Sequence, residues 1–426
     1  MRSGLSLAEA QDLVLGATSV LDSETVATVD ALGRVLAEPV DSTRTLPPAD
    51  CSAMDGYAVR AADLVQASSA APVELPVVYE VAAGGQSPRA LAAGEVARIF
   101  TGAPVPPGAD TVVRQEDTEH EGDRGRISVA PPLREHIRSA GEDLAEGARV
   151  LEAGARLRSP EIGLLASLGR SVVAVHQRPK VAILSGGDEL VEPDGDVRGG
   201  RIVSSNSYTL AAQCREVGAE PVYLGIARDR PEDLEARVRA GLRADCIVSS
   251  AGVSVGDHDH VRPVLEKLGC RLAFWGVNIK PGYPVTFGTF AESGHEGRGG
   301  PLVFGLPGNP VSASVTFEQF VRPALRKMLG HRALFRPIVR ARLGEPLRKK
   351  AGRLHFVRVQ LERQGTEVVA SSTGSQSSGV MRSLSIAQGL LVFPADETEL
   401  AEGAEVIVQV IDEGFFAGQS RGFVAN

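Results

Sequence analysis

The sequence contains few cysteines, four in 426 residues. Cys51, Cys214, Cys246 and Cys270 are widely spaced and form no C-x-x-C pair, which excludes a zinc knuckle and gives no disulfide pattern. Buried free thiols are the simpler interpretation. Long apolar runs are also missing, because no stretch approaches the roughly 18 apolar residues of a membrane-spanning helix. The N-terminus lacks the basic start and continuous apolar stretch of a secretory signal, so we expect a cytoplasmic protein.

An excess of positive charge is missing as well. The chain has 45 lysines and arginines against 53 aspartates and glutamates, a net charge of -8. Nucleic acids and anionic membranes bind basic surfaces, so neither is expected as a partner. Any anionic ligand must therefore be bound by local features of a site. The 43% hydrophobic and 23% charged content is that of an ordinary globular protein, and the length predicts several domains.

Short β-branched runs alternate with helical patterns between Val181 and Ala324. This alternation is typical of βαβ units, so we predict a doubly wound α/β domain with a parallel sheet. A proline- and glycine-rich region from about Leu46 to Ser139 has short β-like runs, which predicts a small β domain. The stretch before it has the periodicity of a helix, and alternating segments after about His331 predict a C-terminal β-barrel or sandwich.

Three loops that follow predicted strands of the central domain are rich in glycine and serine. They are "SGGDEL" after "VAIL", "SSAGVSVGDHDH" after "DCIV", and "GLPGNPVSAS" after "PLVF". Ligands of open α/β sheets bind beyond the carboxyl ends of the strands. One such loop is better explained as a tight βα turn, but three in one domain predict a phosphate site built from backbone N–H groups and hydroxyls. The predicted lining residues are Ser185, Gly186, Gly187, Ser250, Gly252, Gly308, Asn309, Pro310 and Ser312.

Carboxylates in the first two loops indicate a divalent cation. Asp188, Glu189 and Asp259 would repel a phosphate unless a cation lay between them, and magnesium prefers such oxygen ligands. We therefore predict a pyrophosphate bridged by magnesium or another divalent cation. Helix capping by Asp188 explains the first loop equally well. His258 and His260 have no partners at zinc spacing, so we interpret them as solvated loop histidines.

Other polar residues stand out in loops away from these three. Lys280 interrupts the apolar segment "FWGVNIKPGYPVTFG" and precedes Pro281 and Gly282, a rigid context that favours contact with an anion. Asp55 and Thr101 lie in loops of the predicted small β domain, where turn chemistry alone is an equally good explanation.

Taken together, these segments resemble the MoeA family of molybdopterin molybdenumtransferases, which also includes the E domain of gephyrin. The matching segments are "SAMDGYAVR", "IFTGAPVPPGADTVV", "GEDL", "LSGGDEL", "SSAGVSVGDHD", "KPG" and "FGLPGNPVSAS". They occur in family order from about Leu5 to Gly330, and "GSQSSGVMRSLSIAQGLLVFP" is similar to the last domain of the family. The resemblance covers nearly the whole chain.

The resemblance implies a multidomain α/β plus β fold and a homodimer. Its parts are a helical and extended N-terminal domain of residues 1–46 and 142–178, an inserted β-rich domain of 47–141, a central MogA-like, doubly wound α/β molybdopterin-binding domain of 179–330, and a C-terminal β-barrel of 331–426. The homodimer is expected to be elongated and L-shaped. The inserted domain of one subunit would reach the α/β domain of the other.

The resemblance also implies a reaction. The family takes molybdopterin adenylate and molybdate as substrates, uses Mg²⁺ or another divalent cation, releases AMP and delivers molybdenum to the dithiolene. A molybdopterin adenylyltransferase and recipient molybdoenzymes are implied as further partners. The residues matched to catalytic positions are Asp55, Thr101, Asp143, Glu189, Asp229, Asp259 and Lys280, with Asp188, Glu189 and Asp259 around the metal. Ser254, Asn309 and Ser312 would line the pterin phosphate path, and Arg358 and Ser378 would contact the oxyanion.

Two positions depart from the family pattern. Bacterial members usually carry lysine at the position of Gly276 and often at that of Tyr283, where the gephyrin-like branch also lacks it. Each lysine would supply charge-assisted hydrogen bonds to an oxyanion. The choice between molybdate and tungstate therefore stays open, and a tungstate-inserting paralogue is one alternative. A non-catalytic molybdopterin-binding scaffold is another, but it would need no metal-binding carboxylates. A nucleotide hydrolase on this scaffold would need only the α/β domain.

Overall fold

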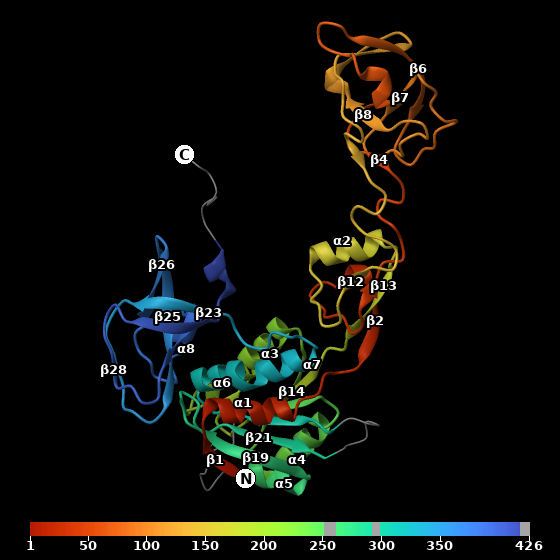
Figure 1. Ribbon diagram of the computed structural model, residues 1–426. Coiled ribbons are helices and arrows are strands. Elements are labelled where there is room, and N and C mark those ends of the chain that lie inside the picture. Colours follow the sequence, from red (N-terminus) through yellow and green to blue (C-terminus); the bar gives the residue numbers. More distant parts are fainter. Residues whose placement is uncertain (251–260, 292–298, 418–426) are drawn as a thin grey trace. The chain divides into compact units, whose positions relative to one another are not determined.

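The computed structural model describes residues 1–250, 261–291 and 299–417 (Figure 1). These residues form two compact units. The first combines residues 1–37, 154–158 and the chain from 172 onward, and the second combines residues 38–153 and 159–171. Within the described ranges, no helix has both the length and the hydropathy needed to cross a membrane.

A seven-stranded sheet lies at the centre of the first unit. Its strand order is β1-β19-β21-β22-β18-β14-β17. The bounds are β1 (Arg2–Leu5), β14 (Lys180–Gly186), β17 (Glu220–Ala227), β18 (Cys246–Ser249), β19 (Cys270–Val277), β21 (Thr286–Phe290) and β22 (Leu302–Gly305). The predicted parallel pairing holds for β22, β18, β14 and β17. It is wrong for β21, which is antiparallel to both neighbours because the connection from β19 is too short for a crossover helix.

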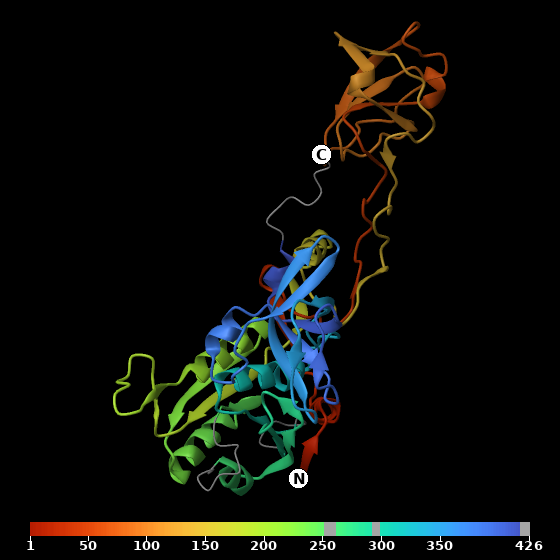
Figure 2. The same ribbon diagram turned by 90° about the vertical axis from the view of Figure 1, so that its left-hand side faces the viewer.

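Helices cover both faces of this sheet (Figures 1 and 2). One face carries α1 (Leu7–Gly16), α3 (Ser205–Val217), α6 (Pro310–Thr316) and α7 (Arg322–Met328), and the other carries α4 (Pro231–Gly241) and α5 (Val261–Lys267). A π-helical turn, Phe317–Val321, joins α6 to α7. The four residues Val181–Leu184 of β14 are all buried, as expected for a strand covered on both faces.

A closed β-barrel follows in the same unit and confirms the predicted C-terminal barrel. Its strands pair in the ring β25 (Leu354–Gln364), β26 (Glu367–Ser372), β23 (Ile338–Leu343), β29 (Glu405–Val410) and β27 (Gly389–Phe393), which returns to β25. β20 (Ile279–Lys280) pairs in parallel with β25. Smaller elements are β24 (Leu347–Arg348), β28 (Glu399–Leu400), α8 (Met381–Ser385), β2 (Ser23–Ala27), β13 (Val172–His176), β15 (Leu190–Val191) and β16 (Ile202–Val203).

The second unit is built around a six-stranded sheet of order β8-β5-β7-β6-β10-β9. The bounds are β5 (Gly56–Val59), β6 (Val73–Val81), β7 (Val96–Ile99), β8 (Thr111–Arg114), β9 (Thr118–Glu121) and β10 (Arg124–Ile127). Alternate residues form a core on each face, with Tyr57 and Val113 on one and Ala58 and Val112 on the other. The unit also holds β3 (Val40–Asp41), β4 (Cys51–Ser52), β11 (Ile137–Arg138), β12 (Arg149–Leu151) and α2 (Ser159–Ser167).

The fold class is therefore multidomain α/β plus β, as predicted. The predicted domain boundaries stay predictions. The two compact units divide the expected N-terminal domain between them, because residues 1–37 belong to the first unit and residues 38–46 to the second.

Candidate active site

The carboxyl ends of four neighbouring parallel strands meet at one edge of the central sheet. These strands are β22, β18, β14 and β17. The predicted loops at residues 185–189, 249–250 and 306–309 therefore follow adjacent strands, and the loop with Asp229 joins them after β17. The rest of the second loop, including Gly252, Ser254, His258, Asp259 and His260, lies outside the described residues.

Four buried serine hydroxyls link these loops to the start of α3. Ser185 Oγ lies 2.8 Å from Ser207 Oγ and 3.1 Å from Ser250 Oγ. Ser204 Oγ lies 3.1 Å from Ser185 Oγ and 2.7 Å from Ser207 Oγ. A hydroxyl both donates and accepts, so the four groups can satisfy one another away from water. The network holds the N-terminus of α3, whose dipole favours an anion, against the strand ends.

Asn206, in the first turn of α3, contacts the third loop. Its Nδ2 donates to the Gly308 carbonyl oxygen over 2.7 Å, which fixes the orientation of the amide because a carbonyl only accepts. The Oδ1 atom is buried and has no hydrogen-bond partner in the described part of the chain. Such an acceptor suits an N–H donor from a ligand. Sequence reasoning missed Asn206, although "VSSNSYTL" places capping serines at the start of a helical pattern.

The acidic residues of the first loop lie beside Asp229. The Asp188 N–H donates to Asp229 Oδ2 over 3.2 Å, and the Asp229 N–H donates to Asp188 Oδ1 over 3.3 Å. The Glu189 carboxylate lies beside Gly187, whose φ is +142°, and a Cβ at Gly187 would overlap that carboxylate. The described residues contain no group of three acidic, histidine or cysteine side chains arranged to hold a metal. These oxygen donors fit magnesium, which takes one or two carboxylates together with substrate phosphates.

Lys280 lies where β20 joins the C-terminal barrel. It is exposed and stands opposite His355 in the register of β20 with β25. Burial, together with the charges of Lys280 and Arg358, lowers the pKa of His355 to about 4. His355 is therefore neutral at pH 7, and the positive charges at this place come from its neighbours.

The turn formed by Lys280, Pro281 and Gly282 packs against α6, the helix that follows the third loop. Pro281 is joined to Lys280 by a cis peptide bond. Gly282 has a φ of +109°, and a Cβ there would overlap the Thr316 methyl group and lie 3.8 Å from the Ser312 carbonyl oxygen. Asn309 is the N-cap residue of α6 and Pro310 is its first residue. The helix α6 therefore connects the two segments, since the third loop leads into it and the turn packs against it.

Gly276 and Tyr283 pack on each other. Gly276 has a φ of +80°, and a Cβ there would lie 3.2 Å from Cζ of Tyr283. The Tyr283 ring meets Trp275 edge-on, with ring centroids 5.6 Å apart. The guanidinium of Arg353 lies over the Tyr283 ring, 4.3 Å from its centroid, in a cation–π contact. Arg353 directly precedes Leu354, the partner of Ile279 in the β20–β25 pair, so Tyr283 holds a cation near the strands that carry Lys280.

Ser378 contacts the start of α6, and Arg358 of β25 contacts the segment just before Ser378. The Val311 N–H donates to the Ser378 carbonyl oxygen over 3.1 Å. Arg358 is fully buried and donates from Nη2 to the carbonyl oxygens of Ser375 and Ser377, at 3.0 and 3.2 Å. Its Nε and Nη1 atoms are buried without a hydrogen-bond partner among the described residues. Arg358 alternates with Val357 and Val359 of the barrel core, so it supports this segment from the opposite face of β25.

Asp55, Thr101 and Asp143 belong to the second unit. The Thr101 N–H and Oγ1 donate to Asp55 Oδ1 over 2.7 and 2.8 Å. These two bonds, with a smaller effect of the Arg98 charge, hold the pKa of exposed Asp55 below its ordinary value. The Asp143 N–H donates to the Leu46 carbonyl oxygen over 3.0 Å. Sequence reasoning missed Arg98 because it lies within a strand and not in a loop.

Comparison with known proteins decides the family. Three family models match most of the chain: the MoeA N-terminal region (domain I and II) at residues 5–169, a probable molybdopterin binding domain at 182–327, and the MoeA C-terminal region (domain IV) at 340–411. A molybdopterin molybdenumtransferase of Nostoc sp. is 40% identical over 93% of this chain and 91% of its own. This chain belongs to the MoeA family.

Further MoeA relatives agree. A molybdopterin molybdenumtransferase of Haemophilus influenzae is 35% identical over 89% of this chain and 92% of its own. The crystal structure of a molybdopterin biosynthesis MoeA protein from Pyrococcus horikoshii OT3 has a TM-score of 0.81 and 30% identity, and the match covers 96% of this chain and 100% of that one. The predicted MoeA resemblance is thereby confirmed.

Proposed function

We propose that this MoeA chain is a molybdopterin molybdenumtransferase. It inserts molybdate into adenylylated molybdopterin, with release of AMP that depends on a divalent cation, and gives molybdenum cofactor. The observation that carries the proposal is the gathering of strand-end loops and the start of α3 at one sheet edge. The names of the two relatives above support it.

The loops at the sheet edge bind the two phosphate groups that join molybdopterin to AMP. Cleavage of the phosphorus–oxygen bond between these two phosphate groups develops negative charge on the bridging oxygen. Preorganised N–H groups stabilise such charge. Backbone N–H groups of the glycine loops and the N-terminus of α3 provide them. Asn206 Oδ1, buried without a partner among the described atoms, accepts a hydrogen bond from an N–H of the pterin. The residues assigned to this path are Ser185, Gly186, Gly187, Ser250, Pro281, Gly282, Gly308, Asn309, Pro310 and Ser312, with Gly252 and Ser254 outside the described residues.

Asp188 and Glu189 hold magnesium against the phosphates, with Asp229 supporting the loop through its bond to Asp188. Both residues present exposed carboxylates at the loop. The cation, when bound, neutralises phosphate charge as AMP leaves. Asp259 is assigned to the same set, although it lies outside the described residues.

Lys280 and Arg353 attract molybdate. Tyr283 supplies the platform that keeps Arg353 in place, which compensates for the missing lysines. The two departures from the family pattern belong together, because any side chain at Gly276 would press against the Tyr283 ring. Arg358 and Ser378 line the barrel side of this site.

Asp55, Thr101 and Asp143 complete the site from a second copy of the chain. These three residues belong to the second compact unit, whereas Glu189 and Lys280 belong to the first. The Thr101 N–H keeps the pKa of Asp55 below its ordinary value and so favours the carboxylate form. That carboxylate can orient a proton or a cation near the phosphates. A molybdopterin adenylyltransferase upstream and recipient molybdoenzymes downstream are the further partners.

The test is AMP release from molybdopterin adenylate by the purified full chain with magnesium, with molybdate and tungstate titrated in parallel. We expect release that depends on molybdate. Release that depends only on tungstate would instead assign a tungstate-inserting paralogue. Tight binding of the adenylate without AMP release would contradict the proposal and favour a non-catalytic scaffold. Release without any oxyanion would indicate a nucleotide hydrolase.

A further inference from the structure

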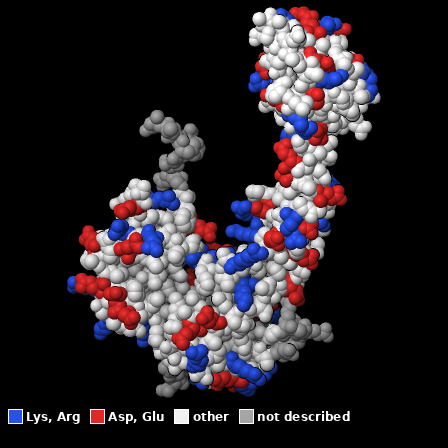
Figure 3. Space-filling view, in the orientation of Figure 1, with Lys and Arg blue, Asp and Glu red and all other residues white. Residues whose placement is uncertain are grey.

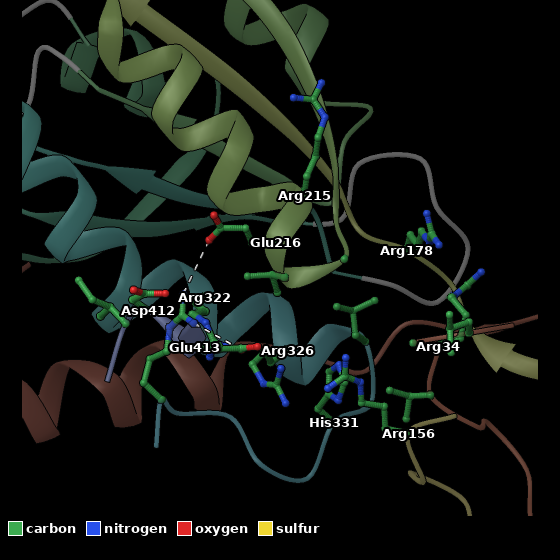
Figure 4. Close-up of a pocket in the computed structure, with 18 residues that line it drawn as sticks. Arg34, Arg156, Arg178, Arg215, Glu216, Arg322, Arg326, His331, Asp412 and Glu413 are labelled. Atoms are coloured by element: carbon green, nitrogen blue, oxygen red, sulfur yellow. Dashed lines mark ion pairs between the residues drawn. The ribbon is translucent and has the colours of Figure 1, made fainter. Parts of the chain in front are cut away.

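A cavity of the first unit has seven arginines among the eighteen residues that line it (Figure 4). Its volume is about 460 Å³, within the range of roughly 300–1,000 Å³ typical of small-molecule sites. The charged lining residues are Arg34, Arg156, Arg178, Arg215, Arg322, Arg326 and Arg336, with Glu216, Asp412 and Glu413. We call it the arginine cavity. In the space-filling view, basic side chains gather over α3 and α7 (Figure 3), the helices that carry Arg215, Arg322 and Arg326.

The acidic residues near the cavity leave most of its arginines unpaired. Arg336 forms ion pairs with Glu216 and Glu413, each at 3.8 Å, and with Glu318 at 2.8 Å. Arg34 pairs with Glu24. The remaining pair, Arg322 with Glu318, is long at 3.6 Å. No ion pair to an acidic residue is found for Arg156, Arg178, Arg215 or Arg326 in the described ranges.

Two buried donors of the cavity point to a missing acceptor. Arg34 and Arg322 are 9% and 7% exposed. Nε of Arg34 has no hydrogen-bond partner within the described part of the chain, and Nε of Arg322 has only the long contact of 3.6 Å with Glu318 Oε2. A buried N–H without an acceptor costs about 1–3 kcal/mol, and more where the group is charged. The buried lining residues therefore include an arginine N–H without an acceptor, and Arg156, Arg178 and Arg215 are exposed donors of the same cavity.

Two pKa values at the cavity are lowered mainly by burial, and neighbouring positive charges add to the effect. Burial, with the charges of Arg326 and Arg156, lowers the pKa of His331 to about 4. Burial and the neighbouring Arg336 lower the pKa of Arg322 to about 10. Both shifts show that the protonated form is disfavoured here, first by burial and then by the nearby arginines.

The arginine cavity is distinct from the candidate active site. Both lie along α3, but Asn206 and Ser207 stand in its first turn, whereas Arg215 and Glu216 stand in its last. At 1.5 Å rise per residue, nine residues separate Asn206 from Arg215 by about 14 Å along the axis. A ligand with two phosphate groups in one site does not reach the donors of the other.

We propose that the arginine cavity binds a compact anion of the diphosphate class. Guanidinium groups present planar pairs of donors that match phosphate oxygens, and several are needed to offset two phosphates. Apart from His331, the described lining has no aromatic ring on which a nucleobase could stack. Recognition therefore rests on phosphate groups, and inorganic pyrophosphate is the probe of choice.

The experiment is calorimetric titration of inorganic pyrophosphate, inorganic phosphate and AMP into the full chain without magnesium. We expect pyrophosphate to bind at least about tenfold more tightly than phosphate or AMP, because it engages more arginines. Arg156→Ala and Arg215→Ala should each weaken pyrophosphate binding about tenfold. Arg243→Ala is the matched control, since Arg243 is also exposed and lies outside the cavity, and it should bind as the wild type does.

Thermal unfolding separates a lost site from a lost fold. Pyrophosphate should raise the unfolding midpoint of the wild type and of Arg243→Ala, but not that of Arg156→Ala/Arg215→Ala. The double variant should still release AMP from molybdopterin adenylate, so failure of this site and failure of the proposed function are distinguishable. Equal pyrophosphate binding in all variants would overturn the proposal. Absence of pyrophosphate binding to the wild type would also overturn it. If the double substitution instead dissociates a dimer, the cavity belongs to a subunit interface and the proposal is wrong.

Discussion

Tyr283 holds the Arg353 guanidinium over its ring, 4.3 Å from the centroid. Tyr283→Ala removes this support, and a cation–π contact contributes about 1 kcal/mol. We expect the molybdate concentration for half-maximal AMP release to rise about fivefold, with a smaller change in the rate at saturating molybdate. Steady-state AMP release at varied molybdate measures both.

Tyr283→Phe is the matched control for this residue, because it keeps the ring and removes only the hydroxyl. It should behave as the wild type does, whereas Arg353→Ala should resemble Tyr283→Ala. Unchanged molybdate dependence in Arg353→Ala would show that the oxyanion binds elsewhere and that the missing lysines are not compensated here.

His355 links stability to pH. Its folded-state pKa is about 4, against an ordinary value of 6.5, so the unfolded chain binds a proton first as the pH falls. The stability that His355 contributes is fully present above pH 6.5 and is lost between pH 6.5 and pH 4, by up to roughly 3 kcal/mol. His355→Gln should lack this component. Urea unfolding at pH 7, 5.5 and 4.5, followed by the fluorescence of the single tryptophan, Trp275, tests it, and parallel pH dependence in both proteins would contradict it.

The loop after β14 depends on a backbone conformation that only glycine adopts easily. A methyl group at Gly187 would overlap the Glu189 carboxylate at a φ of +142°. Gly187→Ala should lower the rate of AMP release by about tenfold or more and leave the unfolding midpoint nearly unchanged, because the loop lies at the sheet edge. Gly199→Ala is the matched control, since Gly199 also has a positive φ but has no atom within 4 Å of a Cβ. Similar rates of AMP release in the two variants would show that the conformation of the first loop is not needed for catalysis.

Strands and their terminal loops could be predicted from local sequence, because an apolar run followed by glycine and serine describes one strand end at a time. The order of the strands then brought those ends to one edge. Asn206, Arg353 and the arginine cavity could not be found in this way. Arg353 lies over the Tyr283 ring, and the charge of Arg336 acts on Arg322, because the fold brings together segments that are separate in the sequence. The direction of β21 could not be predicted either, because its apolar residues suit a parallel or an antiparallel strand equally well.

For the whole molecule, the resemblance predicts which domains exist, and the proposed catalytic residues are divided between the two compact units. Asp55 and Thr101 belong to one unit, and Glu189 and Lys280 belong to the other. A chain that uses its own second unit and a dimer that exchanges units would have the same sequence pattern and the same secondary structure. Only an experiment with two differently altered chains separates these arrangements.

Co-expression of Asp55→Asn with Glu189→Gln is that experiment. Each variant alone should release AMP at less than about a hundredth of the wild-type rate, because each loses a proposed catalytic carboxylate. If sites form in trans, a mixed dimer contains one site with both native carboxylates. Random pairing should then restore about a quarter of wild-type activity. If sites form within one chain, or if the chain is a monomer, every site carries one substitution and no activity returns. Mixed dimers can also be purified by giving the two variants different affinity tags. In the trans arrangement, these purified mixed dimers should show half of the wild-type rate.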